Sequence, residues 1–378
     1  MIKNKFKKII ANLMNPPIKL AGLDIGKSYI KIMEIEGETL ATAKVTHYAI
    51  EPIPEEIIKY DNSERDINEI ENIGAIIKKC WKKSGVSTKN MVVSLPNISV
   101  IDRKQELEVL DEDDSIMLHI VGRQMSNHLP TDMTEEDVVL DYAIRNKEHR
   151  GVDNVNEVLM LAGKKNQIDE ITSMVEAAGL TPYILDVEKY AIENLIHLMK
   201  KKDFNNKTYL LLDTSFDVMR IMIWRDGEIV ANKDTEFGGR NFNESIMRHF
   251  NVDYLTAENM KKERDSAEYL NLEEEFLNDY VKQVLVNFDY ISSAIPGALE
   301  VDEFIVIGGV ASTPNFLTKL ENAIKLDEQT SIKTAPYIAR PLEKMEKSSK
   351  INQEKFHQDE SKLFLVTSLA LRQFLRNY

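Results

Sequence analysis

One pattern occurs twice in this chain, about half its length apart, and it constrains the fold more than any other feature. Residues 20–32, LAGLDIGKSYIKI, predict a strand, a tight turn and a second strand, with Asp24 closing the first strand. Residues 209–221, YLLLDTSFDVMRI, repeat this order with Asp213 in the same place. Short continuous apolar runs of this kind are typical of buried strands. The sequence therefore predicts two related hairpins.

Each predicted turn offers small residues, hydroxyl groups and free backbone N–H groups beside a carboxylate. Two such hairpins that face each other can hold a phosphate chain on their backbone amides. Asp24 and Asp213 can then hold Mg²⁺, directly or through water. Asp and Gly are also ordinary turn residues, so one hairpin alone would indicate only a turn.

A third element favours the functional interpretation. Residues 304–311, FIVIGGVA, predict a buried strand that runs into Gly308 and Gly309, and a helical stretch follows. Glycine lets the backbone approach a flat ligand where a Cβ atom would clash. The order Asp-turn, Asp-turn, Gly-Gly resembles the two phosphate motifs and the adenosine motif of the superfamily that contains actin, Hsp70 and hexokinase.

A charged helical stretch carries Glu258 and Lys261 three residues apart, which places both on one helix face. In bacterial relatives of actin, a Glu-x-x-Lys at this place faces the ribose and the adenine, and the resemblance implies the same here. Taken alone, the pair is better explained as a solvated ion pair.

Composition limits the classes of function. The formal net charge of −14 argues against a broad nucleic-acid surface, and the single cysteine, Cys80, excludes an internal disulfide. No apolar run approaches the roughly 20 residues of a membrane span. The N-terminal start is basic over residues 3–8. This patch could touch an anionic membrane surface, but we expect a frayed tail.

The chain is long enough for two or three domains. We expect an α/β, two-lobed, actin-like (ribonuclease H-like) fold with an inserted subdomain in the first lobe. Residues 1–97 and 179–200 form the first lobe in this scheme, residues 98–178 the insertion, and residues 208–378 the second lobe. The polar run at 200–207 marks the boundary between the lobes, and the charged stretch 341–361 predicts a mobile linker.

Within this superfamily the chain resembles the PilM family of actin-like proteins of type IV pilus assembly, which is related to FtsA. The resemblance rests on the opening 22–26 GLDIG, on Pro130 followed by Asp141 and Tyr142, and on the stretch 178–188, AGLTPYILDVE. Phe237-Gly238-Gly239 and the closing 369–372 LALR also fit. The match covers nearly the whole chain.

The resemblance implies ATP and Mg²⁺ bound between the lobes, with slow hydrolysis at most. The nucleotide-binding residues would be Asp24, Gly26, Lys27, Ser28, Lys31, Asp213, Thr214, Ser215, Gly238, Gly239, Glu258, Lys261, Gly308 and Gly309. Asp186 and Glu188 could act as a base or orient a hydrolytic water, or could cap the helix that begins near Val187, and we favour the cap.

The chain departs from the family pattern in both turns. Lys27 stands where the family usually has a small hydroxyl residue, and it could cap a phosphate or block the turn. The second hairpin lacks the glycine of Asp-x-Gly and has Ser215 instead, so a positive φ would cost more there.

The resemblance also implies a cytoplasmic adaptor, held at the inner membrane because it grips the N-terminal cytoplasmic tail of PilN beside its insertion. Other pilus platform proteins and the pilus motor are further expected partners, and the protein could form oligomers. Two alternatives remain. One is an FtsA-like, membrane-associated filament protein. The other is a small-molecule kinase of the same fold.

Overall fold

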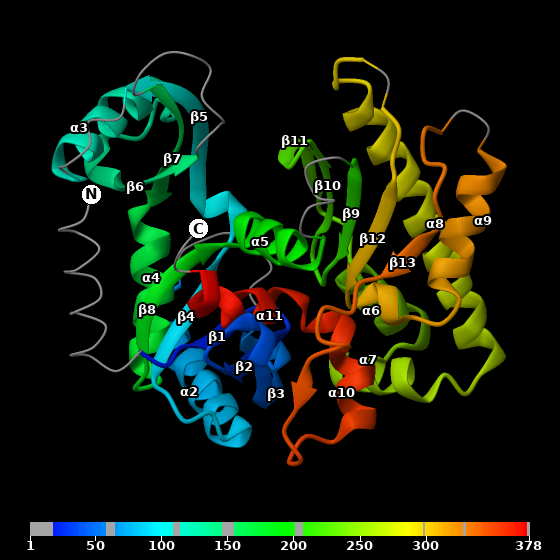
Figure 1. Cartoon of the computed structure of the whole chain (residues 1–378). Coiled ribbons are helices and arrows are strands. Elements are labelled where there is room, and N and C mark those ends of the chain that lie inside the picture. Colours follow the sequence, from blue (N-terminus) through cyan, green and yellow to red (C-terminus); the bar gives the residue numbers. More distant parts are fainter. Residues whose placement is uncertain are drawn as a thin grey trace.

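The computed structural model describes residues 18–57, 65–108, 114–145, 155–200, 207–297, 299–327 and 330–375. The basic stretch 3–8 and most of the joint predicted at 200–207 lie outside these residues. Figure 1 shows two lobes side by side and a smaller subdomain above the first. The expected two-lobed α/β architecture with an insertion in the first lobe is confirmed.

The first lobe is built on a six-stranded sheet with the order β14-β3-β2-β1-β4-β8. Helices α2 and α4 cover one face of this sheet, and α5 and α11 cover the other. The elements are β1 (Ala21–Ile25), β2 (Tyr29–Glu36), β3 (Lys44–Pro52), α2 (Ile67–Ser84), β4 (Asn90–Leu95), α4 (Lys165–Ala177), β8 (Thr181–Val187), α5 (Glu188–Lys200), β14 (Glu346–Lys347) and α11 (Phe364–Leu371).

The second lobe is built on a five-stranded sheet with the order β11-β10-β9-β12-β13. Its elements are β9 (Tyr209–Thr214), β10 (Met219–Arg225), β11 (Glu228–Thr235), α6 (Gly239–Phe250), α7 (Tyr254–Glu263), α8 (Ala267–Ser292), β12 (Glu303–Gly308), α9 (Phe316–Leu326) and β13 (Pro336–Ile338). Strand β9 is buried on both faces, as its continuous apolar run predicts. Leu210 and Leu212 face the outer helices, whereas Tyr209 and Leu211 face the first lobe.

Helices α5 and α11 lie between the two sheets and join the lobes (Figure 1). Ile192 and Ile196 on α5 pack with Phe364 of α11 in one core cluster. Leu211 of β9 and Ile305 of β12 belong to the same cluster. This shared apolar layer fixes the hairpin β1–β2 relative to the hairpin β9–β10, because burial of large side chains on both sides opposes sliding of the sheets.

The inserted subdomain has a three-stranded sheet with the order β5-β7-β6, covered by helix α3. The elements are β5 (Val100–Glu108), α3 (Asp114–Met125), β6 (Val138–Arg145) and β7 (Val155–Lys164). Helix α4 follows β7 but packs on α2 of the first lobe. A Cβ atom at Gly74 would lie 2.7 Å from the Cβ atom of Ala177. The insertion therefore ends near Lys164, before the expected boundary at residue 178.

The last forty residues differ most from the prediction. The stretch 341–361, predicted as a mobile linker, contains β14, which pairs with β3, and helix α10 (Gln353–Asp359). Helix α11 then packs on β1, where a Cβ atom at Gly22 would lie 2.5 Å from the carbonyl oxygen of Val366. The C-terminal segment thus returns to the first lobe. The sequence concealed this because its anchors, Leu342, Ile351 and Phe356, follow no regular period between charged residues.

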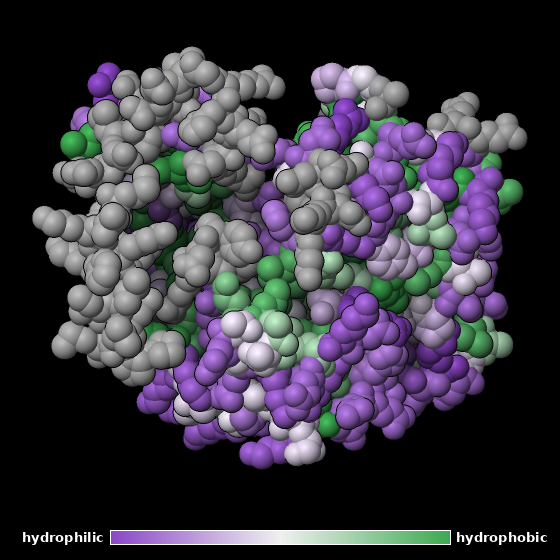
Figure 2. Space-filling model, in the orientation of Figure 1, coloured by the Kyte–Doolittle hydropathy of each residue, from purple (hydrophilic) through white to green (hydrophobic). Residues whose placement is uncertain are grey.

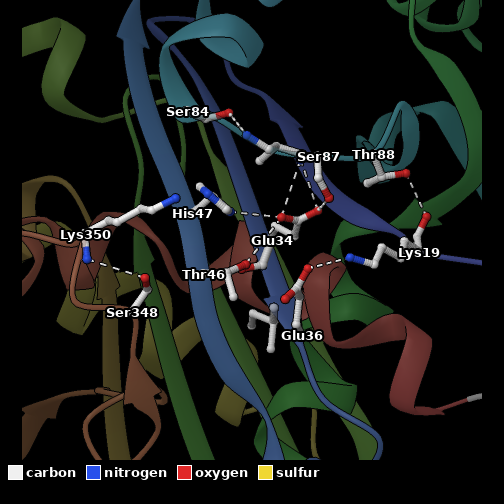
Figure 3. A network of polar contacts seen from close by, with 12 residues as sticks. Lys19, Glu34, Glu36, Thr46, His47, Ser84, Ser87, Thr88, Ser348 and Lys350 are labelled. Carbon is white, nitrogen blue, oxygen red and sulfur yellow. Dashed lines mark hydrogen bonds and ion pairs between the residues drawn. The ribbon is translucent and has the colours of Figure 1, made fainter.

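Hydrophilic side chains cover most of the visible surface of the second lobe, and the surface is hollowed between this lobe and the inserted subdomain (Figure 2). A polar network lies on the first-lobe sheet (Figure 3). Its centre is Glu34, which is 1% exposed. Glu34 accepts hydrogen bonds from Ser87 Oγ at 2.8 Å and Thr46 Oγ1 at 3.3 Å, and it contacts His47 Nδ1 at 3.0 Å. The network ties β2 and β3 to the segment before β4.

Candidate functional site

The two repeated hairpins have the same geometry. The backbone N–H of Gly26 donates to the carbonyl of Tyr29 at 3.1 Å, and that of Ser215 donates to Val218 at 3.2 Å. Within the described residues, no residue of the second turn has a positive φ. The missing glycine at Ser215 therefore imposes no backbone strain. The predicted cost of a positive φ at Ser215 was wrong, because this turn does not use the left-handed region.

Each hairpin also carries a cation directly opposite its carboxylate. Lys31 Nζ lies 2.6 Å from Asp24 Oδ2, and Arg220 lies 3.4 Å from Asp213 Oδ2. Both pairs face each other across an antiparallel ladder, so the register of the strands sets the pairing. Ser215 donates a further hydrogen bond of 2.7 Å to Asp213.

Arg220 is the hub of a carboxylate cluster in which Asp213 is buried, Glu188 is half-buried and Asp234 is exposed. Besides Asp213, its guanidinium contacts Glu188 at 3.1 Å and Asp234 at 3.0 Å. Burial raises the pKa of Glu188 to about 7, although the Arg220 charge opposes the shift. Burial also raises the pKa of Asp213, again against Arg220. Burial works to lower the pKa of Arg220, but its three carboxylates hold that pKa above the ordinary value.

Four carboxylates in this cluster share two cations. Asp24 pairs with Lys31, while Glu188, Asp213 and Asp234 all pair with Arg220. Buried like charges destabilise one another unless a proton or a cation neutralises them. The cluster is therefore able to take up further positive charge.

Three polar contacts cross from the first lobe to the second around the same cleft. Glu188 reaches Arg220, Lys27 Nζ lies 2.9 Å from Asp217 Oδ2, and the Tyr29 hydroxyl donates to Glu258 at 3.1 Å. The first contact joins the start of α5 to β10, and the second joins the β1–β2 turn to the β9–β10 turn. The third joins β2 to α7. The three contacts join the two lobes across the cleft.

Glu258 and Lys261 belong to a compact network on α6 and α7. Lys261 donates to Glu258 at 2.7 Å and to Asn243 at 2.6 Å, and Asn243 donates to Glu258 at 2.7 Å. Burial works to raise the pKa of Glu258, but the Lys261 ammonium and these hydrogen bonds bring it below its ordinary value. Glu258 is thus a charged, oriented acceptor and not a solvated surface residue.

These groups line one cleft of about 610 Å³ between the lobes. The predicted residues found in its wall are Asp24, Gly26, Lys27, Ser28, Lys31, Glu188, Asp213, Ser215, Gly239, Glu258, Lys261, Gly308 and Gly309. The cleft is charged between the hairpins, and it is open at Gly309, where a Cβ atom would meet nothing within 4 Å.

Three predicted residues do not line the cleft. Thr214 is fully buried, and its hydroxyl donates to Ile307 and accepts from the backbone N–H of Ala311. At Gly238 a Cβ atom would lie 2.3 Å from the carbonyl oxygen of Phe216, so the glycine serves close packing. Asp186 contacts Arg372 at 3.3 Å, on the side of α11.

Gly308 lines the cleft for a reason other than the one expected. Its φ is +98°, and a Cβ atom there would lie 2.6 Å from the backbone of Thr214. The glycine allows β12 to approach β9 and to turn out of the sheet. Of the two glycines, Gly309 is therefore the one whose open side can face a ligand.

Sequence reasoning missed several residues of the cleft wall: Asp217, Arg220, Asp234, Arg240 and Lys362. Arg220 carried a usable signal, because it follows Asp213 by seven positions, as Lys31 follows Asp24. Burial lowers the pKa of Lys362, which reaches the cleft from the C-terminal segment. Its position depends on the return of that segment to the first lobe.

Comparison with known proteins places the chain in a family. A family model described as type IV pilus assembly protein PilM matches residues 22–374. The chain belongs to the PilM family. No helix in the described ranges is both long and apolar enough to cross a bilayer. In those same ranges, no group of three or more His, Cys, Asp or Glu side chains is arranged as a metal site.

Solved structures support the fold of this PilM-family protein. The PilM-PilN type IV pilus biogenesis complex contains a chain that matches with a TM-score of 0.75 at 20% identity, covering 95% of this chain and 99% of that one. The ethanolamine utilization protein EutJ of Carboxydothermus hydrogenoformans matches with a TM-score of 0.50 at 12% identity, over 94% and 90% of the two chains. The fold is actin-like, as the motif order suggested.

Curated relatives include the cell division protein FtsA from two strains of Staphylococcus epidermidis. Their identities to this chain are 23% over 278 residues and 24% over 277 residues. Each match covers 62% of this chain and 58% of the FtsA sequence. The chain thus matches a little over half the length of these relatives.

Proposed function

We propose that this protein is a nucleotide-binding adaptor of type IV pilus assembly, with ATP and Mg²⁺ in the cleft between its lobes. The observation that carries the proposal is the convergence on one cleft of two carboxylate-bearing hairpins with the same strand register. Four carboxylates share two cations there. Mg²⁺ is commonly held by one or two carboxylates together with phosphate oxygens and water. The donor set fits that chemistry.

The residues divide into three roles. Asp24 and Asp213 would hold the metal, which supplies charge neutralisation for the phosphates when it is bound. Lys31 and the backbone N–H groups of the two turns would bind phosphate oxygens. Glu258, with its charge set by Lys261, would accept hydrogen bonds from the ribose or the base, beside the open side of Gly309.

We expect hydrolysis to be slow. A general base must be deprotonated and within reach of the attacking water. Glu188 lines the cleft, but the Arg220 guanidinium lies 3.1 Å from its carboxylate and competes with a water molecule for it. Asp186 is paired with Arg372. ATP binding therefore matters more for this protein than its turnover, which suits an adaptor.

The partner we propose is the N-terminal cytoplasmic tail of a PilN-type membrane protein. Strand β6 is the edge of the inserted sheet, and β8 is the edge of the first-lobe sheet. Val139, Ile144 and Tyr183 are exposed along these edges. An extended peptide can pair with a free edge and place apolar anchors beside it. The protein would then lie at the inner membrane through its partner.

The test is equilibrium titration with labelled ATP in the presence of Mg²⁺ or EDTA, with and without a tail peptide. Wild type should bind ATP more tightly with Mg²⁺. Asp24→Ala should remove the metal-dependent part of the affinity, and Gly309→Val should weaken binding sterically, because φ at Gly309 is −77° and permits a side chain. Undiminished ATP affinity in both variants would exclude this site.

The peptide arm separates the adaptor from its alternatives. Tail-dependent recruitment to vesicles supports an adaptor, whereas equal binding to anionic vesicles without the tail would favour an FtsA-like membrane protein. Rapid phosphate transfer to a small acceptor would favour a kinase.

A further inference from the structure

We propose that Lys27 is a phosphate-binding residue whose resting partner is Asp217, and that a bound polyphosphate takes Lys27 from that carboxylate. The ion pair between Lys27 and Asp217 joins the two lobes. This inference rests on the proposed nucleotide site, and it adds an exchange of partners that the site itself does not require.

The Lys27–Asp217 pair joins the two hairpin turns directly. Lys27 stands in the turn between β1 and β2, and Asp217 stands in the turn between β9 and β10. Their charged atoms are 2.9 Å apart, and both residues line the cleft. Backbone hydrogen bonds fix both turns, from Gly26 to Tyr29 and from Ser215 to Val218. The side chains can therefore exchange partners without a change in either turn.

The two partners differ in how firmly they are held. The Lys27 side chain is 40% exposed, whereas that of Asp217 is 10% exposed. A lysine ammonium is a point charge on a flexible stem, and it can form hydrogen bonds in several directions. Lys27 is therefore the partner that can move. Asp217 is the partner that is fixed within its own lobe.

A second cation beside Asp217 lowers the free energy that the loss of Lys27 would cost. Arg240 Nε lies 3.7 Å from Asp217 Oδ1. The backbone N–H of Arg240 donates to the carbonyl of Phe216 at 2.8 Å, which anchors the start of α6 to the same turn. A buried carboxylate that loses its only cation destabilises the fold strongly. Arg240, which also lies 3.7 Å from Glu244 Oε1, remains beside Asp217 when Lys27 leaves, so this cost is reduced.

The chemistry selects a phosphorylated ligand. A di- or triphosphate carries more negative charge than a single carboxylate and offers several oxygen atoms, so it competes well for the Lys27 ammonium. An unphosphorylated nucleoside carries no negative charge, so it does not compete with Asp217 for the Lys27 ammonium. The pair should thus increase the preference for nucleotides over nucleosides. When a nucleotide binds, the loss of this ion pair removes one contact between the lobes.

The experiment compares Lys27→Met, Asp217→Asn and the double variant with wild type, using ATP–Mg²⁺ and adenosine as probes. Lys19→Met is the matched control, because Lys19 also forms an ion pair, at 2.7 Å to Glu36 (Figure 3), and neither residue lines the cleft. Lys27→Met should weaken ATP binding roughly tenfold and leave adenosine binding unchanged. Asp217→Asn should tighten ATP binding about threefold, because Lys27 loses its competitor.

The double variant gives the decisive result. Asp217→Asn should have no effect on ATP affinity when Lys27 is already replaced. If Asp217→Asn weakens ATP binding as Lys27→Met does, or if Lys27→Met leaves ATP affinity at the wild-type value, the exchange is wrong while the nucleotide site stands. If wild type binds no ATP at all, the proposed function and the exchange both fail.

Discussion

Two glutamates of the first lobe, the buried Glu34 and the half-buried Glu188, have opposite surroundings. Glu34 lies within a network in which hydroxyl groups, a backbone N–H and a histidine nitrogen all serve one carboxylate (Figure 3). Glu188 lies at the start of α5, and Arg220, its cationic partner among the described residues, also pairs with Asp213 and Asp234. Glu34 has several hydrogen-bond donors to itself, whereas Glu188 and two further carboxylates share the single guanidinium group of Arg220.

The difference separates structure from function in this molecule. A carboxylate whose hydrogen bonds are all satisfied stabilises the strands around it and leaves nothing for a ligand to supply. A cluster with unbalanced charge costs stability, and a bound cation or proton can remove that cost. The cleft is therefore the region where stability and ligand binding should oppose each other. The Glu34 network should affect stability alone.

The largest effect should come from the satisfied network. Glu34→Ala leaves Ser87 and His47 without their buried acceptor, and it should lower the free energy of unfolding by about 3 kcal/mol. Urea denaturation measures this change. ATP affinity should stay at the wild-type value. Lys19→Met, which removes only an exposed ion pair beside the same sheet, should change stability by less than about 0.5 kcal/mol.

Replacing a carboxylate of the charged cleft should raise the free energy of unfolding, whereas replacing Glu34 should lower it. The ordinary pKa of Glu188 is 4.5, and its pKa in the fold is about 7. The native state therefore holds a proton that the unfolded chain releases. Stability is full below pH 4.5 and falls as the pH rises through 7. Glu188→Gln removes this loss and should raise stability by about 2 kcal/mol at roughly pH 8.

The pH dependence distinguishes this explanation from simple repacking. The advantage of Glu188→Gln over wild type should shrink as the pH falls and vanish below about 4.5, where wild-type Glu188 is protonated in both states. Chemical denaturation at a series of pH values tests this. A gain of the same size at every pH would show that charge in the cluster is not its cause.

The smallest effect on stability should come from the hydrogen bond between Tyr29 and Glu258, which joins the lobes but is not the only hydrogen bond that Glu258 accepts. Tyr29→Phe removes the hydroxyl that donates to Glu258 at 3.1 Å. Glu258 keeps Lys261 and Asn243, so the loss in stability should be about 0.5–1 kcal/mol. Thermal unfolding is sensitive enough to detect it. A loss above about 2 kcal/mol would mean that this contact, and not the shared apolar layer, holds the lobes closed.

Most of the architecture could be predicted from local patterns. Continuous apolar runs before Asp24, Asp213 and Gly308 predicted three buried strands, and the structure has β1, β9 and β12 there. Their order also pointed to the two-lobed fold. The segment after residue 340 was misjudged, because Leu342 and Phe356 act as isolated anchors on a surface made by distant strands. No periodicity within the segment could reveal that surface.

The sequence by itself determined which turns carry carboxylates, because a strand that ends in a turn is a local feature. It also contained the register that sets Lys31 opposite Asp24 and Arg220 opposite Asp213. Only the tertiary structure decided which charges share a partner. Glu188 reaches Arg220, and Lys27 reaches Asp217, because α5 and α11 pack the two sheets together. Contacts between residues so far apart in the chain depend on that packing, and no local pattern encodes it.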